Sequence, residues 1–392
     1  MKIYIDVSVL TLATYVTGIQ RVTREIIVRL IRKEGDSVVL LHYNAKENCF
    51  HRIDNAAFIG YYVYGQGIKN RMITKSCIAL SDIGKGSLFF ELDGVWMSRV
   101  KRSWLLPILK KQGARIVVHV YDIISITHPQ YSFERGVFNF MDYLAAHMQY
   151  ADQIIVNAKA TVEELKNLAE RLGIPLPPCK VVPLGSDFGE RKPIQERLVS
   201  DHLVEVVKSA PYILMVGTIE PRKNHSLLLR AYEEGLREAG YHLIFAGYMG
   251  WNMEEFERRL HNHPDFGKRI FHFQGLDDIE IGYLYQNARY LAFCSYQEGF
   301  GLPIVESIIR GTPVLCPDQP VYREVGEDYP IWFKQENPES LCEKVAYYDE
   351  NPEEYKKMKE NLKNYKPITW DDSFGYMEEA LLQDREKYEK ES

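Results

Sequence analysis

Two carboxylates in the second half of the chain have a spacing that suits carbohydrate chemistry. Glu298 follows the apolar run Tyr290–Ser295, and Glu306 comes after seven further residues that include Pro303. Proline suits the first turn of a helix, so we expect Glu298 on a loop and Glu306 on the helix behind it. Carboxylates accept hydrogen bonds from vicinal hydroxyls, so one glutamate can bond a sugar and the other a ribose. An ordinary loop charge at Glu298 and an ion pair at Glu306 are the alternative interpretation.

The turn between these glutamates is rich in glycine. Gly299 and Gly301 let the backbone approach a ligand closely, and Phe300 and Leu302 complete the turn. The amino terminus of the following helix carries a positive partial charge and exposed amide donors. We therefore expect this turn to stabilise a phosphate group.

Two adjacent cations stand behind another hydrophobic run. Arg222 and Lys223 follow the run Tyr212–Gly217, whose last residue, Gly217, is expected to lie close to a ligand, and they precede a helical pattern. A guanidinium forks onto phosphate oxygens and an ammonium acts as a point charge, so together they can neutralise a diphosphate leaving group. Taken alone, such a pair is usually solvated surface.

Strands and helices that alternate along the chain must position these residues. Short β-branched or aliphatic runs between helical patterns are typical of parallel strands joined by crossover helices. We predict two doubly wound, Rossmann-like α/β domains. The predicted strands are Lys2–Asp6, Val38–His42, Leu88–Leu92, Ile116–Tyr121 and Ile154–Asn157 in the first domain, and Tyr212–Gly217, His242–Gly247, Arg269–Phe273, Tyr290–Ser295 and Pro313–Cys316 in the second.

A stretch rich in proline and glycine, Lys180–Arg197, predicts a hinge between the domains. We place the first domain at residues 1–188 and the second at residues 189–369, and we expect the amphipathic tail, 370–392, to pack back on the first. Ligands of open α/β sheets bind beyond the carboxyl ends of the strands, so two such domains facing each other create a cleft for chemistry.

The composition is that of an ordinary globular protein. Hydrophobic residues make up 46% and charged residues 26% of the 392, which excludes a disordered or fibrous chain. No apolar run approaches the ~20 residues needed to cross a bilayer. Asp6 interrupts the apolar start of the chain, which we interpret as a buried strand and not as a signal peptide. The six cysteines show no C-x-x-C pair and no histidine spacing suited to zinc, so we expect free thiols in a cytoplasmic protein.

Charge is distributed unevenly along the chain. Residues 1–180 carry a net charge of +7 and the remainder −13. A basic half can meet phosphate-bearing lipid at the inner face of the plasma membrane, or it can be an ordinary solvated surface. No nucleic-acid partner is expected. The basic residues gather at Arg21, Arg24, Arg29, Arg32 and Lys33, and at Arg99, Lys101, Arg102, Lys110 and Lys111.

Together these segments resemble a known family. Val216–Asn224 and Glu298–Gly311, with Pro313, Val314, Glu324 and Gly326, look like retaining glycosyltransferases of family 4, which have the GT-B fold. The spacing from Glu298 to Glu306 is the hallmark of that family. The resemblance is to bacterial mannosyl- and rhamnosyl-type polysaccharide enzymes. It implies transfer of a hexose-type sugar from a nucleoside-diphosphate sugar to a hydroxyl of a glycan or lipid-linked acceptor, with retention of configuration.

The resemblance also implies roles for individual residues. Arg222 and Lys223 would bind the donor diphosphate, Glu306 the nucleotide ribose and Glu298 the transferred sugar, while the amides of Phe300–Leu302 would cap the distal phosphate. The nucleotide sugar is a substrate and no cofactor is implied. GDP-mannose is the first candidate donor, and a UDP- or dTDP-sugar is the alternative.

The first half resembles the family in two segments. Thr17–Arg21 is similar to the glycine loop before the first helix, which implies that Gly18 lies near the donor phosphate. His119–Pro129 is similar to the acceptor-side segment, in which Asp122 would orient the sugar or acceptor. A helix-capping or turn role for Asp122 is the alternative. Closure of the domains would bring both residues towards the donor.

The chemistry implied is charge stabilisation. Glycosyl transfer passes through an oxocarbenium-like transition state, and the diphosphate leaves once its growing charge is stabilised. Arg222 and Lys223 would supply that stabilisation, and the chain has no convincing Asp-x-Asp loop, so we predict metal-independent transfer. A catalytically silent nucleotide-sugar-binding subunit supporting a partner enzyme is the alternative function. A nicotinamide dehydrogenase is disfavoured because neither half opens with G-x-G-x-x-G after its first strand.

Overall fold

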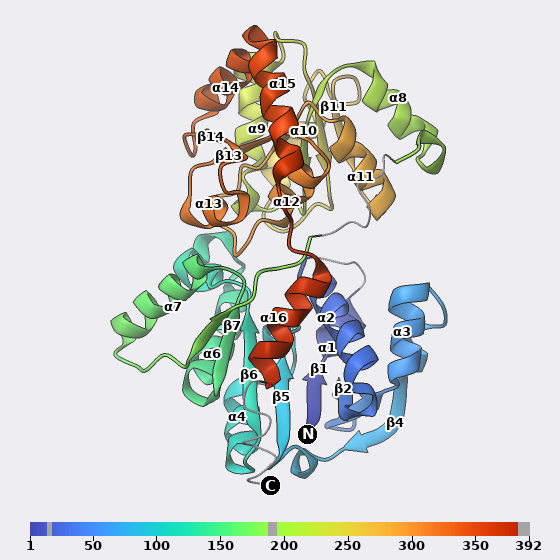
Figure 1. Ribbon diagram of the computed structural model, residues 1–392, viewed down its shortest axis with the longest axis vertical. Helices are drawn as coiled ribbons and strands as arrows, with labels where there is room; N and C mark the ends of the chain where they lie inside the picture. The colour runs from blue at the N-terminus through green and yellow to red at the C-terminus, as the bar shows by residue number, and fades with distance from the viewer. Residues whose placement is uncertain (14–17, 187–193, 383–392) are drawn as a thin grey trace. The chain divides into compact units, whose positions relative to one another are not determined.

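The apolar runs assemble into two separate sheets (Figure 1). The computed structural model describes residues 1–13, 18–186 and 194–382. The first unit comprises Met1–Gly185 and the C-terminal segment from Trp370, and the second comprises Ser186–Thr369. The predicted boundary between residues 188 and 189, and part of the predicted hinge, lie outside the described residues.

Among the described residues, the first unit contains an eight-stranded sheet with the order β4-β3-β2-β1-β5-β6-β7-β8. The five strands predicted here are present. Along the sheet, β2, β1, β5, β6, β7 and β8 each pair in parallel with the next, as the doubly wound fold requires. The strand bounds are β1 Lys2–Asp6, β2 Val38–Asn44, β3 Cys49–Ile53, β4 Ile73–Ile78, β5 Ser87–Glu91, β6 Arg115–Val120, β7 Gln153–Val156 and β8 Cys179–Val181.

Strands β3 and β4 were not predicted, and both are antiparallel to their neighbours. Only residues 45–48 separate β2 from β3. A parallel connection needs a crossover of a dozen residues or more, so this short turn forces a hairpin. The doubly wound sheet of the first unit therefore ends in an antiparallel edge.

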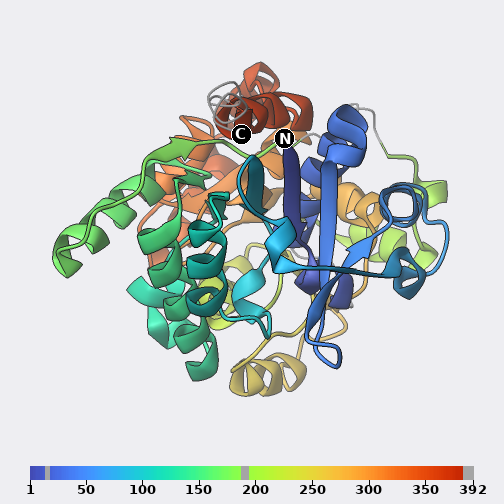
Figure 2. The ribbon, with the colours of Figure 1, turned by 90° about the horizontal axis from the view of Figure 1, so that it is seen from below.

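Helices cover both faces of the first sheet (Figure 2). On one face, Leu105 and Leu109 of α4 pack with Tyr4 of β1 and Phe89 of β5. The last helix, α16, lies beside α2 (Figure 1), and Arg29 of α2 forms an ion pair with its Asp371. The helix bounds are α1 Ser8–Leu12, α2 Gly18–Glu34, α3 Asn55–Tyr64, α4 Arg102–Lys111, α5 Ile124–Thr127, α6 Glu134–Tyr150, α7 Lys159–Leu172 and α16 Trp370–Leu382.

In the described part of the second unit, six parallel strands have the order β11-β10-β9-β12-β13-β14. Their bounds are β9 Tyr212–Val216, β10 His242–Ala246, β11 Ile270–Phe273, β12 Tyr290–Ala292, β13 Val314–Pro317 and β14 Ile331–Phe333. The helices are α8 Asp201–Ser209, α9 His225–Ala231, α10 Glu254–His261, α11 Asp278–Asn287, α12 Leu302–Ile309, α13 Pro320–Gly326, α14 Pro338–Glu350 and α15 Pro352–Asn361.

The core of the second unit explains why its strands read as unbroken apolar runs. Residues Tyr212–Met215 of β9 are all buried, so both faces of this central strand are covered. Such strands are hydrophobic throughout and do not alternate with polar residues. The strand order is that of a dinucleotide-binding Rossmann fold, in which the chain reverses its direction of travel across the sheet beside the first strand.

Candidate functional site

Both charged segments of the second unit begin where its sheet reverses direction. The chain proceeds from β9 outward through β10 and β11, then returns to place β12 on the other side of β9. Ligands of open parallel sheets bind at such a switch point, beyond the carboxyl ends of the strands. Arg222 and Lys223 follow β9 and Glu298 follows β12, so the prediction that they lie near one crevice has a topological basis.

Arg222 is held by acceptors from the loop after β9 and from the loop after β12. It lies in a 3-10 turn, Pro221–Lys223. Its Nη2 lies 2.5 Å from Oε1 of Glu220, which is buried, and its Nη1 donates to the carbonyl oxygen of Gln297 at 3.1 Å and also pairs with Glu298. A guanidinium bonded on several sides keeps one orientation, so Arg222 presents a fixed positive charge at the switch point.

Lys223 and Glu298 contact each other at the same switch point. Nζ of Lys223 donates to Oε1 of Glu298 at 2.9 Å, and the hydroxyl of Ser295 donates to the same oxygen at 3.0 Å. Gly217 makes room for the Lys223 side chain, because a Cβ there would lie 3.2 Å from Cε of Lys223, and its φ of 129° suits glycine. The side chains of Lys223 and Glu298 are 13% and 12% exposed.

The electrostatics of this cluster keep Glu298 ionised. Burial alone would raise the pKa of Glu298, but the charges of Arg222 and Lys223 outweigh it and lower the pKa to about 2. An ionised carboxylate accepts hydrogen bonds and has no proton to give. Glu298 is therefore suited to bind a hydroxyl and unsuited to act as a general acid.

Backbone bonds that the sequence did not reveal join the two loops. The amide of Tyr296 donates to the carbonyl oxygen of Arg222 at 2.9 Å. The carbonyl oxygen of Tyr296 in turn accepts bonds from the side-chain amides of Gln319 at 2.7 Å and Gln335 at 3.1 Å. These contacts fix the loop after β12 against the loop after β9, and no spacing rule would have found them.

The glycine-rich turn leads into helix α12 as predicted. Gly301 is its N-cap in the left-handed region, with a φ of 97°, and its carbonyl oxygen accepts the amide of Ile304 at 2.9 Å. A Cβ on Gly301 would lie 3.3 Å from the ring of Phe293, so both conformation and space favour glycine. The helix begins at Leu302 and directs the positive end of its dipole towards the turn.

Glu306 is anchored away from the Arg222–Lys223–Glu298 cluster. It lies on α12, is 7% exposed, and its Oε2 accepts a hydrogen bond from the hydroxyl of Tyr285 on α11 at 2.9 Å. Tyr285 is fully buried. A carboxylate held in this way has a fixed orientation, and Tyr285 is a positioning residue that sequence reasoning missed.

The remaining predicted site residues belong to the first unit. Gly18 is exposed and begins α2, while Thr17 lies outside the described residues. Asp122 follows β6 and is half-buried, and its Oδ1 accepts the amide of Ile124, the first residue of α5, at 3.0 Å. This contact matches the turn interpretation of Asp122 and leaves its acceptor-side role a prediction.

In each of the two basic clusters, one arginine is paired with carboxylates inside the first unit. Arg102 is 1% exposed, donates to Asp6 at 2.6 Å and to Glu91 at 2.8 Å, and so has its charge neutralised inside the first unit. Arg29 pairs with Glu25 and Asp371. A buried guanidinium needs such partners because an unpaired charge in the interior is costly. Arg102, which is buried, is therefore not available to a membrane surface.

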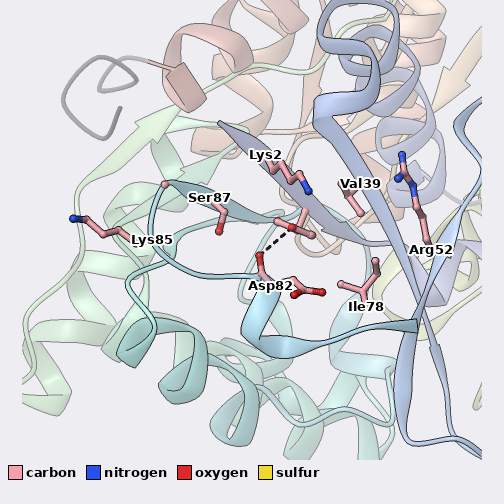
Figure 3. Close-up of a pocket in the computed structure, with 9 residues that line it drawn as sticks. Lys2, Val39, Arg52, Ile78, Asp82, Lys85 and Ser87 are labelled. Carbon is pink, nitrogen blue, oxygen red and sulfur yellow. Dashed lines mark hydrogen bonds between the residues drawn. The ribbon is translucent and has the colours of Figure 1, made fainter. Parts of the chain in front are cut away.

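A pocket of about 310 Å³ lies at the amino ends of strands in the first sheet (Figure 3). Lys2 and Ser87, which begin β1 and β5, line it with Arg52 and Lys85, and the hydroxyl of Tyr4 bonds the carbonyl oxygen of Asp82 at 3.0 Å beside it. Ligand sites of this fold lie at the carboxyl ends of the strands. This pocket lies at the amino ends and is distinct from the candidate site.

Comparison with known proteins identifies the family of the second unit. Residues 204–365 match the family described as glycosyl transferases group 1. The chain is 30% identical over 364 residues to the serotype-specific mannosyltransferase WbdA of Escherichia coli, in an alignment that covers 89% of this chain and 42% of WbdA. It is 38% identical over 119 residues to O-antigen chain mannosyltransferase B of Escherichia coli, which covers 30% of this chain and 31% of that protein. The chain thus spans less than half the length of either relative.

The fold is shared with solved structures of other proteins. The Anabaena protein HepE in complex with UDP superposes with a TM-score of 0.65 over 98% of this chain and 100% of its own, at 14% identity. Among the described helices, none combines the length and the apolar character that a bilayer span requires. The two α/β units have the GT-B fold, and residues 204–365, which contain the whole cluster around Glu298, match the glycosyl transferases group 1 family.

Proposed function

We propose that this chain is a glycosyltransferase that moves a hexose-type sugar from a nucleoside-diphosphate sugar to a hydroxyl of a glycan or lipid-linked acceptor in cell-surface polysaccharide synthesis. The observation that carries the proposal is the cluster of Arg222, Lys223 and Glu298 at the switch point between β9 and β12. It combines cations for a diphosphate with an ionised acceptor for a sugar hydroxyl. The mannosyltransferase names of its relatives support a sugar donor of this kind.

Lys223 is the residue best placed to receive the donor phosphate. An ammonium has three N–H donors, and among the described residues only Glu298 takes one of them. Two donors remain for phosphate oxygens. As the bond between the anomeric carbon and the diphosphate oxygen breaks, the electron pair stays with that oxygen, and Lys223, Arg222 and the amino terminus of α12 stabilise the growing negative charge.

Glu298 can bind the transferred sugar without giving up its ion pairs. Its Oε1 accepts bonds from Lys223 and Ser295, and its Oε2 pairs with Arg222. Each carboxylate oxygen has two acceptor positions, so one position on Oε2 is left for a sugar hydroxyl. A hydroxyl held there fixes the sugar for attack by the acceptor.

Several finer features are part of the proposal. Transfer with retention, by same-face attack of the acceptor oxygen, rests on the resemblance to family 4. Two cations at the leaving-group position support transfer that needs no divalent metal in the active site. The carboxylate of Glu306, fixed by Tyr285, would accept the ribose hydroxyls. GDP-mannose is the first candidate donor because of the relatives' names, and HepE's complex with UDP keeps UDP-sugars as the alternative.

A donor screen followed by a turnover assay tests the proposal. Thermal shift is measured against GDP-, UDP- and dTDP-sugars, and the hit is incubated with polysaccharide acceptor fragments. We expect one nucleotide sugar to raise Tm and to release its nucleoside diphosphate, without added Mg²⁺ or Mn²⁺. Binding without release would favour the silent subunit instead. NMR of the product linkage decides the stereochemistry, and an inverted anomer would contradict retention.

A further inference from the structure

A second cluster of chemically reactive side chains lies in the first unit, on the antiparallel edge of its sheet. Glu47 precedes β3, and Cys49 and His51 lie on it at alternate positions. Alternate residues of a strand point to the same face, so these side chains share one side of the sheet. Cys77 of β4 lies directly opposite His51 in the strand pairing and therefore belongs to the same face.

The donor atoms of this cluster are close enough to share one ion. The ligand atoms of Glu47, Cys49 and His51 all lie within 4.8 Å of one another, and Nε2 of His51 is 2.9 Å from Oε2 of Glu47. Tetrahedral zinc, with bonds of about 2.0 to 2.3 Å, places neighbouring ligand atoms about 3 to 4 Å apart. Glu47, Cys49 and His51 are near that spacing, and Cys77, directly opposite His51 on β4, offers a fourth donor on the same face.

The hydrogen bonds of His51 give its ring the orientation of a metal ligand. Nδ1 lies 2.8 Å from the carbonyl oxygen of Thr74, and a carbonyl can only accept, so Nδ1 carries the proton. Nε2, the other ring nitrogen, then faces the carboxylate of Glu47 and the rest of the cluster. An N–H bonded to a backbone carbonyl, with the other nitrogen turned to the site, is the usual arrangement around a ligating histidine.

The carboxylate is also held in place. Nδ2 of Asn44 donates to Oε1 of Glu47 at 3.1 Å, which leaves Oε2 facing the histidine. His51 is 5% exposed, so a positive charge beside it would be partly shielded from water. Either a proton on Nε2 or a metal cation can bridge these two atoms. The nearby thiols of Cys49 and Cys77 favour a metal, because a proton needs no further ligands.

We propose that Glu47, Cys49, His51 and Cys77 bind one zinc-class divalent ion that fastens β4 to the β2–β3 hairpin. Thiolate and imidazole ligands select borderline-soft metals such as zinc over magnesium or calcium. Four protein ligands leave no open position, so the ion is structural and takes no part in catalysis. Strand β4 is the outer strand of the sheet, and an ion there strengthens an edge that is otherwise held by one neighbour.

The test uses the full-length protein, purified under reducing conditions and freed of metal. We expect it to bind one equivalent of Zn²⁺ with a rise in Tm, and to give a thiolate-to-metal absorption band with Co²⁺. Cys49→Ser and Cys77→Ser should each weaken Zn²⁺ binding at least about tenfold. Cys179→Ser is the matched control, because Cys179 is also a partly exposed thiol of the first unit, and it should bind as the parent does.

Other outcomes overturn the proposal. No stoichiometric Zn²⁺ binding would leave a protonated His51 paired with Glu47 as the explanation of their contact. Full binding by Cys77→Ser would remove Cys77 and contradict the closed four-ligand site. If a cysteine variant fails to fold, Glu47→Gln provides the second test. Glu47 is 60% exposed, so the Glu47→Gln protein should fold but bind Zn²⁺ more weakly.

Discussion

The ammonium of Lys223 and the carboxylate of Glu298 meet at 2.9 Å although 75 positions separate them in the chain. The contact joins the loop after β9 to the loop after β12, at the point where the sheet reverses direction. Both side chains are largely buried, so their charges are screened less than those of a surface pair. The predictions for the proposed donor site therefore start from this buried ion pair.

Replacing Lys223 tests the proposed phosphate contact. Lys223→Ala should weaken binding of the nucleotide sugar roughly tenfold to a hundredfold, because a hydrogen bond to a charged group contributes about 1.5 to 3 kcal/mol. Titration calorimetry measures the change. Lys208→Ala is the control, since Lys208 is an exposed lysine of the same unit paired with Glu196. Equal affinity in Lys223→Ala and the parent would remove Lys223 from the donor site.

Replacing Glu298 predicts a pH-dependent loss of stability. The folded pKa of Glu298 is lowered to about 2, so its ionised form stabilises the fold fully above its unfolded pKa of about 4.3, and this stabilisation is lost as the pH falls through about 2. The Glu298→Gln variant lacks this pH-dependent stabilisation. Urea unfolding at pH 7 and pH 3 should give a larger difference between parent and variant at pH 7. A difference that does not change with pH would contradict the ionised pair.

Glu306 and Tyr285 form a pair whose variants test how the anchored carboxylate contributes to binding and to stability. Glu306→Ala should weaken nucleotide-sugar binding, and unchanged affinity would exclude Glu306 from the site. Tyr285→Phe removes one hydrogen bond from a buried carboxylate, which costs about 1 to 3 kcal/mol of stability, and it should also weaken binding because Glu306 loses its orientation. Calorimetry and urea unfolding of both variants measure the two effects.

The buried charges of the first unit predict a large stability effect away from the donor site. Arg102→Ala leaves Asp6 and Glu91 in the interior without their cation, and should cost about 3 to 5 kcal/mol. Lys111→Ala, on the same helix but exposed, should change the free energy of unfolding by less than about 0.5 kcal/mol. Similar small effects in both variants, measured by urea unfolding, would show that Asp6 and Glu91 do not need Arg102.

The sequence predicted the parts of the fold that local chemistry determines. The apolar runs of β9 and β12 are buried on both faces, and the residues after them lie at the carboxyl ends of adjacent strands, so Arg222 and Glu298 could be placed near each other. The glycine and proline signals around Gly301 predicted the start of α12 because they reflect the backbone itself.

Contacts between distant segments could not be predicted from the sequence. The bonds from Gln319 and Gln335 to the carbonyl oxygen of Tyr296 depend on three separate loops meeting, and nothing in the spacing reports that. Arg102 was counted as surface because lysine and arginine usually are, and only the fold brings Asp6 to it. The proposed zinc site has no sequence spacing of its own, because Cys49 and His51 alternate along a strand and Cys77 comes from the neighbouring strand.

Sugar transfer by the parent protein and by Lys223→Ala tests the central claim most directly. Both are incubated with the nucleotide sugar found in the donor screen and an acceptor glycan, and product is followed by mass spectrometry together with release of the nucleoside diphosphate. The account predicts that the parent extends the acceptor by one sugar for each nucleotide released and that Lys223→Ala loses at least about tenfold in rate. Release and extension that are absent from the parent, or unchanged in Lys223→Ala, would contradict it.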